Sequence, residues 1–184
     1  MPAPKPIDRK EVWAIIDQMR GVKKLLALCM YAAGGRKFDI FKMLWRDIDL
    51  ERRVIHTLGK GGLPEYMDIP LELHKEFKSY LAHFKETPPR DELVFPPVKG
   101  KARWSITKAL QAAAKKAGVQ QHVTEHVLRH SFATHLMEDG ADARLVQEKL
   151  RHQKLDMVLR YTHVARKRQQ AASDKTFQRP DSGV

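Results

Sequence analysis

Cysteine is nearly absent from this sequence, because Cys29 is the only one in the chain. A single thiol cannot form an internal disulfide, and its setting in the apolar stretch 25–30 predicts a small buried side chain. The sequence also lacks any apolar run near the ~20 residues of a membrane-spanning helix. Residues 1–6 lack the apolar core of a signal peptide. We therefore expect a cytoplasmic protein with no membrane partner.

Acidic residues are few relative to basic ones. The chain has 34 Lys and Arg against 22 Asp and Glu, for a formal net charge of +12. Such a balance indicates a polyanionic partner, because clustered cations bind phosphate backbones. An anionic membrane surface is the competing interpretation, but no basic segment has a continuous apolar face. The charge therefore favours a partner with a phosphate backbone over a membrane surface. The length of 184 residues and the 42% hydrophobic content suit one domain with a real core.

The most informative stretch covers residues 124–136. As one helix it would place His126, Arg129 and His130 on a shared face. Arginine's planar fork suits bidentate contact with a phosphate, and histidine can donate to that phosphate or move a proton near neutral pH. The pattern therefore indicates a site for a phosphodiester. The apolar residues predicted to point inward are Val127, Leu128, Phe132 and Leu136.

Two other kinds of site compete with this interpretation: a zinc site at the histidines and a nucleotide site at the glycine-rich turn 59–62. His126 and His130 imitate half a zinc site, but a metalloprotease would have glutamate where Val127 stands, and Arg129 would repel a divalent cation. The turn at 59–62 lacks the Ser or Thr that follows lysine in a nucleotide-binding P-loop. We predict neither a metal nor another cofactor.

Periodicity and capping residues predict a mainly α-helical α+β fold with a small antiparallel sheet. Strands are predicted at 53–58 and 65–69, joined by the glycine-rich turn, with a short third strand at 93–95. Asp8, Ser105, Thr124 and Asp142 are predicted to cap helices. One predicted helix follows Asp8, another begins at Arg36 and a third begins at Thr124. The other predicted helices cover residues 22–33, 71–86, 106–117, 144–150 and 155–161.

The chain resembles the tyrosine recombinases of the phage-integrase type. Residues 126–136 resemble the family's His-x-x-Arg box, 150–152 its Leu-Gly-His, and 160–164 its nucleophilic tyrosine segment. Upstream, residues 33–39 resemble its Thr-Gly-Leu-Arg-x-x-Glu box, and 59–62 the hairpin that carries its catalytic lysine. Any one box alone would be a weak signal, whereas all of them in the family's order are a strong one.

The resemblance implies the catalytic domain of a site-specific recombinase or integrase, which breaks and rejoins DNA through a covalent 3′-phosphotyrosine without metal or ATP. It implies that Arg36 and Arg129 hold the scissile phosphate and stabilise the transition state. Lys60 would protonate the departing 5′-oxygen, although Leu63 and Glu65 stand where the family usually has further basic residues. A solvated lysine at a glycine-rich turn is the alternative for Lys60.

The remaining catalytic roles implied by the resemblance fall to two histidines and a tyrosine. His126 would accept the tyrosine proton or bond the phosphate, and His152 would donate to a phosphate oxygen. Tyr161, nine residues after His152, would be the nucleophile. Asp39, where the family usually has Glu, would orient its neighbours.

Further basic residues are candidate DNA contacts. For Lys115 and Lys116, the alternative is that they form a solvated helix face. Two departures from the family lie near the site: Gly35 for the usual Leu, and Arg151 for the usual Gly. The predicted DNA-binding residues are Lys115, Lys116, Arg151, Arg166, Lys167 and Arg168.

We expect a catalytic domain at residues 1–164 and a polar tail at 165–184, without the additional N-terminal DNA-binding domain that most members of the family carry. The chain is then either a single-domain recombinase or a catalytic fragment. The tail either frays or docks on a neighbouring protomer. The resemblance implies double-stranded DNA as the partner, a nucleoid-associated location and a homo-oligomer on paired DNA sites. Two other functions stay open: a topoisomerase-like activity of type IB that nicks and reseals, and a non-catalytic DNA-binding regulator on the same fold.

Overall fold

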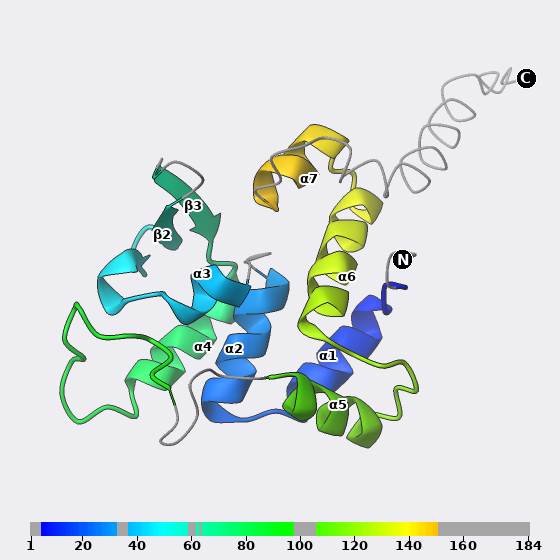
Figure 1. Cartoon of the computed structure of the whole chain (residues 1–184), viewed down its shortest axis with the longest axis horizontal. Helices are drawn as coiled ribbons and strands as arrows, with labels where there is room; N and C mark the ends of the chain where they lie inside the picture. The colour runs from blue at the N-terminus through cyan, green and yellow to red at the C-terminus, as the bar shows by residue number, and fades with distance from the viewer. Residues whose placement is uncertain (1–4, 33–36, 59–61, 63, 98–105, 151–184) are drawn as a thin grey trace, which may run out of the picture. The chain divides into compact units, whose positions relative to one another are not determined.

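The computed structural model describes residues 5–32, 37–58, 62, 64–97 and 106–150. The chain divides into two compact units, Met1–Phe132 and Ala133–Val184. Helix α6 (Glu125–Glu138) begins in the first unit and ends in the second, which also holds α7 (Ala143–Lys149). The first unit contains α1 (Arg9–Asp17), α2 (Gly21–Ala32), α3 (Lys37–Phe41), the short helix η1 (Trp45–Asp47), β1 (Ile48–Asp49), β2 (Val54–Leu58), β3 (Pro64–Asp68), α4 (Leu71–Leu81) and α5 (Thr107–Lys116) (Figure 1).

Helix α1 begins where the sequence predicts. The Asp8 carboxylate accepts from the Lys10 N–H at 2.7 Å, and Glu11 reaches back to the Asp8 N–H at 3.1 Å, which completes a capping box. Helix α2 contacts α1, α3 and α4, and its residues 25–31 are all buried, as the apolar run predicts. Cys29 lies in that run, and burial raises the pKa of its thiol far above the ordinary value.

The sheet of the first unit is antiparallel, with strand order β1-β2-β3. Ile55 of β2 pairs with Ile48 on one side and with buried Met67 on the other, so the apolar positions of the hairpin face the core. Both long strands match the prediction, but the third strand does not lie at 93–95. Leu93 forms an isolated bridge with Leu44, and β1 fills the edge position instead.

Helix α4 is shorter than predicted, because it ends at Leu81 rather than reaching residue 86. Leu73 and Phe77 are buried as expected, whereas Phe84 is 40% exposed. Its ring lies edge-on to Trp45 and Tyr80, which stack on each other at a centroid distance of 6.0 Å. Phe84 thus caps an aromatic cluster at the surface and does not enter the core.

Helix α5 follows Ile106, and the predicted cap at Ser105 lies outside the described residues. Leu110, Ala113 and Ala114 are buried, and α5 packs on α1. In the second unit, the Asp142 carboxylate accepts from the Leu145 N–H at 2.7 Å and caps α7, as predicted. The predicted helix at 155–161 lies outside the described residues. Among the helices that the structure describes, none has the length and apolar character to cross a membrane.

Candidate active site

The first turns of α6 carry the central predicted residues. The Thr124 hydroxyl accepts from the Val127 N–H at 3.3 Å and caps the helix, as predicted. His126 is exposed and Arg129 half-buried, whereas Val127 and Leu128 are buried. The helix therefore turns its apolar residues toward the core, and the side chains of His126 and Arg129 lie on one accessible side.

Farther along α6 the prediction is less accurate. Leu136 is only half-buried, while Thr134, His135 and Met137 are buried. The helix is buried on more than one face at this end, so the simple amphipathic pattern does not hold. The burial of His135 favours a structural role for this histidine.

A long-range contact holds α6 in place. The buried Ser131 hydroxyl accepts from the Ile7 N–H at 3.0 Å and donates to the Val127 carbonyl at 2.8 Å. One residue later, Phe132 meets Tyr31 of α2 edge-on at a centroid distance of 6.1 Å. The middle of α6 is thus tied both to the N-terminal segment and to the last turn of α2.

The contact with α2 links the helix of the predicted His-x-x-Arg box to the helix that precedes the predicted arginine box in the chain. Phe132 follows Arg129 by about one helical turn, and Tyr31 is the residue before the last one of α2. The segment 33–36, which includes Arg36, continues from this end of α2 to α3. The structure therefore joins the helix that carries Arg129 to the helix that leads to the arginine box.

A pocket of about 550 Å³ is lined both by Asp39 and by the strands of the predicted lysine hairpin. Asp39 of α3 lines it together with Leu58 and Pro64, the paired residues at which β2 ends and β3 begins. The segment between those two residues contains Lys60. Charges of both signs line this pocket: Asp39, Lys42, Arg46, Asp47 and Glu65, with His56 beside them.

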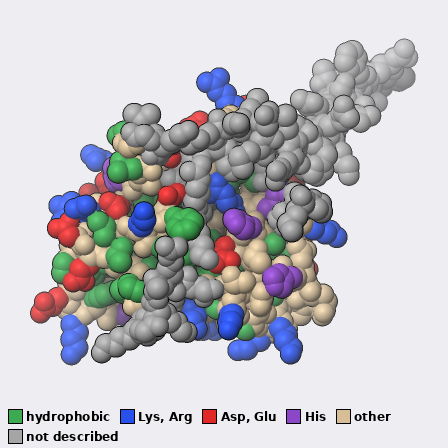
Figure 2. Space-filling model, in the orientation of Figure 1, with side chains coloured by type: hydrophobic (Ala, Val, Ile, Leu, Met, Phe, Trp, Pro, Cys, Tyr) green, Lys and Arg blue, Asp and Glu red, His purple; other side chains and the backbone are tan. Residues whose placement is uncertain are grey.

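The two predicted lysines of α5 lie in its last turn, and both are exposed. Lys116 lines a second pocket of about 530 Å³ with Arg20 and Lys23, over a floor that includes Ala113. In Figure 2, Lys and Arg side chains project along the lower edge, over α5. Arg20 and Lys23 cannot be singled out from the sequence alone, because their proximity to α5 depends on how α1 and α5 pack.

Several predicted site residues lie outside the described residues, and their placement stays a prediction. Among the residues that the structure describes, no three His, Cys, Asp or Glu side chains form a group that could hold a metal ion. The predicted site residues outside the described ranges are Arg36, Lys60, Arg151, His152, Tyr161, Arg166, Lys167 and Arg168.

Solved structures place the fold among the catalytic domains of tyrosine recombinases. A crystal structure of XerA recombinase matches with a TM-score of 0.75 at 22% identity, covering 98% of this chain and 68% of that one. The catalytic domain of bacteriophage HP1 integrase matches with a TM-score of 0.61 at 17% identity, covering 98% of this chain and 99% of that one. XerH site-specific recombinase bound to difH substrate matches with a TM-score of 0.73 at 25% identity, covering 94% and 55%.

Sequence comparison identifies the family. Residues 5–168 match the profile of the phage integrase family, so the chain belongs to that family. It is 34% identical over 183 residues to tyrosine recombinase XerA of Thermococcus kodakarensis, covering 94% of this chain and 62% of the relative. It is 32% identical over 176 residues to tyrosine recombinase XerD of Halalkalibacterium halodurans, covering 90% and 59%. The chain thus spans about three fifths of the length of these curated relatives.

Proposed function

We propose that this chain catalyses site-specific DNA strand cleavage and rejoining through a covalent 3′-phosphotyrosine. The observation that carries the proposal is the match to the phage integrase family over residues 5–168, a range that includes every proposed catalytic residue. The anchored helix with exposed His126 and half-buried Arg129 supports it. A recombinase of the same fold is known bound to its DNA substrate, which supports double-stranded DNA as the partner.

The chemistry starts from the weakness of tyrosine as a nucleophile. With a reference pKa near 10, only about one phenol in a thousand is ionised at pH 7, which corresponds to roughly 4 kcal/mol of barrier. Cations near the scissile phosphate lower that barrier. Arg36 and Arg129 bind its non-bridging oxygens and stabilise the negative charge of the pentacoordinate transition state.

The remaining residues move protons and orient the site. The Tyr161 oxygen attacks phosphorus, its proton passes to His126, and the bond from phosphorus to the 5′-oxygen breaks. Lys60 protonates that leaving oxygen, and His152 donates to a phosphate oxygen. Asp39 orients its neighbours in the pocket that it shares with the ends of the hairpin. A different 5′-hydroxyl then reverses the step, which rejoins the strand.

A nicked suicide substrate tests the proposed reaction, because loss of the short 5′ fragment traps the covalent adduct. The wild-type chain should give a protein–DNA band that survives denaturing electrophoresis. Tyr161→Phe should give none while its DNA affinity stays within about twofold, because the hydroxyl is the nucleophile and contributes little to binding. Capture should persist in excess EDTA. An adduct formed by the phenylalanine variant, or EDTA-inhibited capture restored by zinc, would contradict the proposal.

We also propose the organisation in which the reaction takes place. Residues 1–164 form the catalytic domain and 165–184 a polar tail that docks on a neighbouring protomer in a homo-oligomer on paired DNA sites. The protein acts in the cytoplasm, at the nucleoid. Truncation after Arg168 should preserve one-site gel shifts and reduce two-site complexes and strand exchange; unchanged two-site complexes would contradict the docking role.

A further inference from the structure

Two polar contacts connect α5 to the start of α6. The Thr107 hydroxyl, at the first residue of α5, donates to Oε2 of Glu125, the first residue of α6, at 2.6 Å. One turn later on α5, the Gln111 side-chain nitrogen lies 2.5 Å from Nε2 of His122. Residues four apart share one face of a helix, so both contacts come from the same face of α5. Together they form a brace between α5 and the chain that enters α6.

The α5 end of this brace is fixed. Ile106 and Leu110 are 1% and 0% exposed, and α5 packs on α1, so Thr107 projects from a helix that cannot shift without disturbing the core. The Thr107–Glu125 bond is itself partly buried, where a hydrogen bond is less weakened by competing water. A carboxylate in the first turn of α6 is also favoured by the helix dipole.

The α6 end of the brace lies directly beside the reactive residues. Glu125 immediately precedes His126 and stands one turn before Arg129. The first turn of a helix is prone to fray, since its N–H groups lack partners within the helix. The Thr124 cap satisfies one of them through a bond of 3.3 Å, which is long for a cap. The shorter bond between Thr107 and Glu125 therefore constrains the turn that carries His126.

We propose that Glu125 is a positioning residue for DNA cleavage. Its hydrogen bond with Thr107 sets the first turn of α6, and thereby the placement of His126 and Arg129 against the scissile phosphate. The inference rests on the proposed function. A misplacement of about 1 Å can reduce the rate of a chemical step on the order of 100-fold while substrate binding changes little.

The test measures single-turnover capture of a nicked suicide substrate by the full chain at saturating protein, together with DNA affinity and stability. Glu125→Ala and Thr107→Val should each lower the capture rate about tenfold, with Kd within about twofold of wild type. The double variant should be no slower than the slower single variant, because each change removes the same bond. Thr107→Ser keeps the hydroxyl and should restore the rate to within about twofold.

Two further variants separate positioning from charge and from stability. Glu125→Gln keeps an acceptor for Thr107 and should retain capture within about threefold, with an unchanged pH profile of the rate. Glu11→Ala is the matched control, because it also removes a first-turn carboxylate and its capping contact, but from α1. It should lower stability and leave the capture rate unaltered.

Several outcomes would overturn the inference while leaving the proposed function intact. These are additive losses in the double variant, a rate loss in Glu11→Ala equal to that in Glu125→Ala, or failure of Thr107→Ser to restore capture. If Glu125→Gln is as slow as Glu125→Ala, the loss of rate is due to the missing charge, and the inference is overturned as well. If the wild-type chain forms no adduct with the suicide substrate, the proposed function fails and this inference fails with it.

Discussion

At the residue scale, Ser131 shows how one small polar side chain can hold a helix in place. Its hydroxyl is buried, and it joins two backbone groups, the Ile7 N–H and the Val127 carbonyl. Buried polar groups are costly unless they are hydrogen-bonded, so this serine stabilises the fold through its two contacts. It also ties the N-terminal segment to the helix that carries Arg129.

Ser131→Ala should therefore lower the free energy of unfolding by about 1–2 kcal/mol, since it removes a buried hydrogen bond to Ile7. Chemical denaturation monitored by far-ultraviolet circular dichroism measures the change. Ser79→Ala is the matched control, because Ser79 is exposed on α4 and the same truncation there should stay within about 0.5 kcal/mol. Equal effects of the two variants would refute the role of Ser131.

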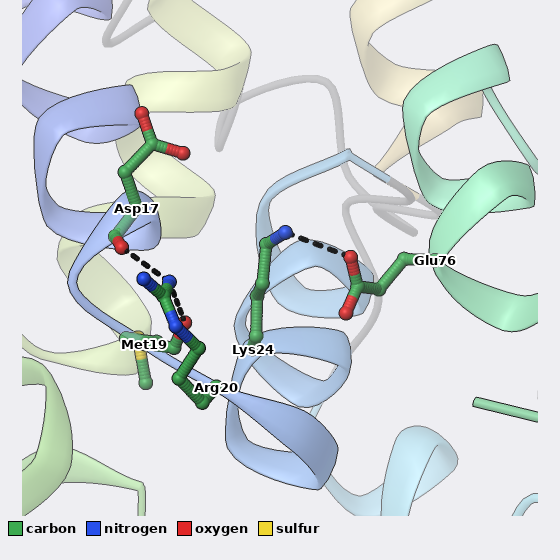
Figure 3. A network of polar contacts seen from close by, with 5 residues as sticks. All are labelled: Asp17, Met19, Arg20, Lys24 and Glu76. Carbon is green, nitrogen blue, oxygen red and sulfur yellow. Dashed lines mark hydrogen bonds and ion pairs between the residues drawn. The ribbon is translucent and has the colours of Figure 1, made fainter. Parts of the chain in front are cut away.

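At the scale of the element, an ion pair connects α2 to α4. Lys24 Nζ lies 2.8 Å from a carboxylate oxygen of Glu76, and the two side chains are only 27% and 18% exposed (Figure 3). Nearby, the Arg20 guanidinium donates to the carbonyls of Asp17 and Met19 at the end of α1. A pair this shielded gains more from attraction than a surface pair but loses more hydration.

We expect single substitutions in this pair to be worse than the double one. Lys24→Met leaves the shielded Glu76 carboxylate without the ammonium group of Lys24 and should lower the free energy of unfolding by about 1–2 kcal/mol. Adding Glu76→Leu removes the stranded charge and should recover most of that loss. A double-mutant cycle by urea denaturation measures the coupling. Additive losses would mean that the pair contributes no interaction energy of its own.

At the scale of the whole molecule, the net charge of +12 is its most general property. The described surface concentrates part of it where Arg20, Lys23 and Lys116 line one pocket. Among the residues that the structure describes, no acidic side chain lines that pocket, whereas the pocket beside Asp39 mixes both signs. The pocket of Arg20, Lys23 and Lys116 is therefore the better candidate for a phosphate-backbone contact outside the site of cleavage.

DNA binding should weaken steeply with salt, by about 10³–10⁵ between 50 and 200 mM if six to ten phosphates are contacted. Lys116→Gln should reduce the slope of log K against log salt by about one. Lys78→Gln, the same charge change at an exposed position of α4, is the control and should leave the slope unaltered. Fluorescence anisotropy titrations at several salt concentrations measure both, and a flat salt response would refute the use of the charge on DNA.

The sequence by itself determined the class of the fold, most of its elements and the family. Capping residues such as Asp8 and Asp142 act on N–H groups two or three positions away, so they can be read locally. The hairpin of β2 and β3 is equally local, because a short turn sets its register. The spacing of His126 and Arg129 follows from the helical repeat alone.

Only the tertiary structure decided where distant segments meet. The edge strand is β1 and not residues 93–95, because pairing depends on which segment lies next to β2 and not on β propensity alone. The contact of Ser131 with Ile7 spans 124 positions, and that of Thr107 with Glu125 spans 18. Neither pair lies within a single helix or strand, so the chain must pack before these residues can be recognised as partners.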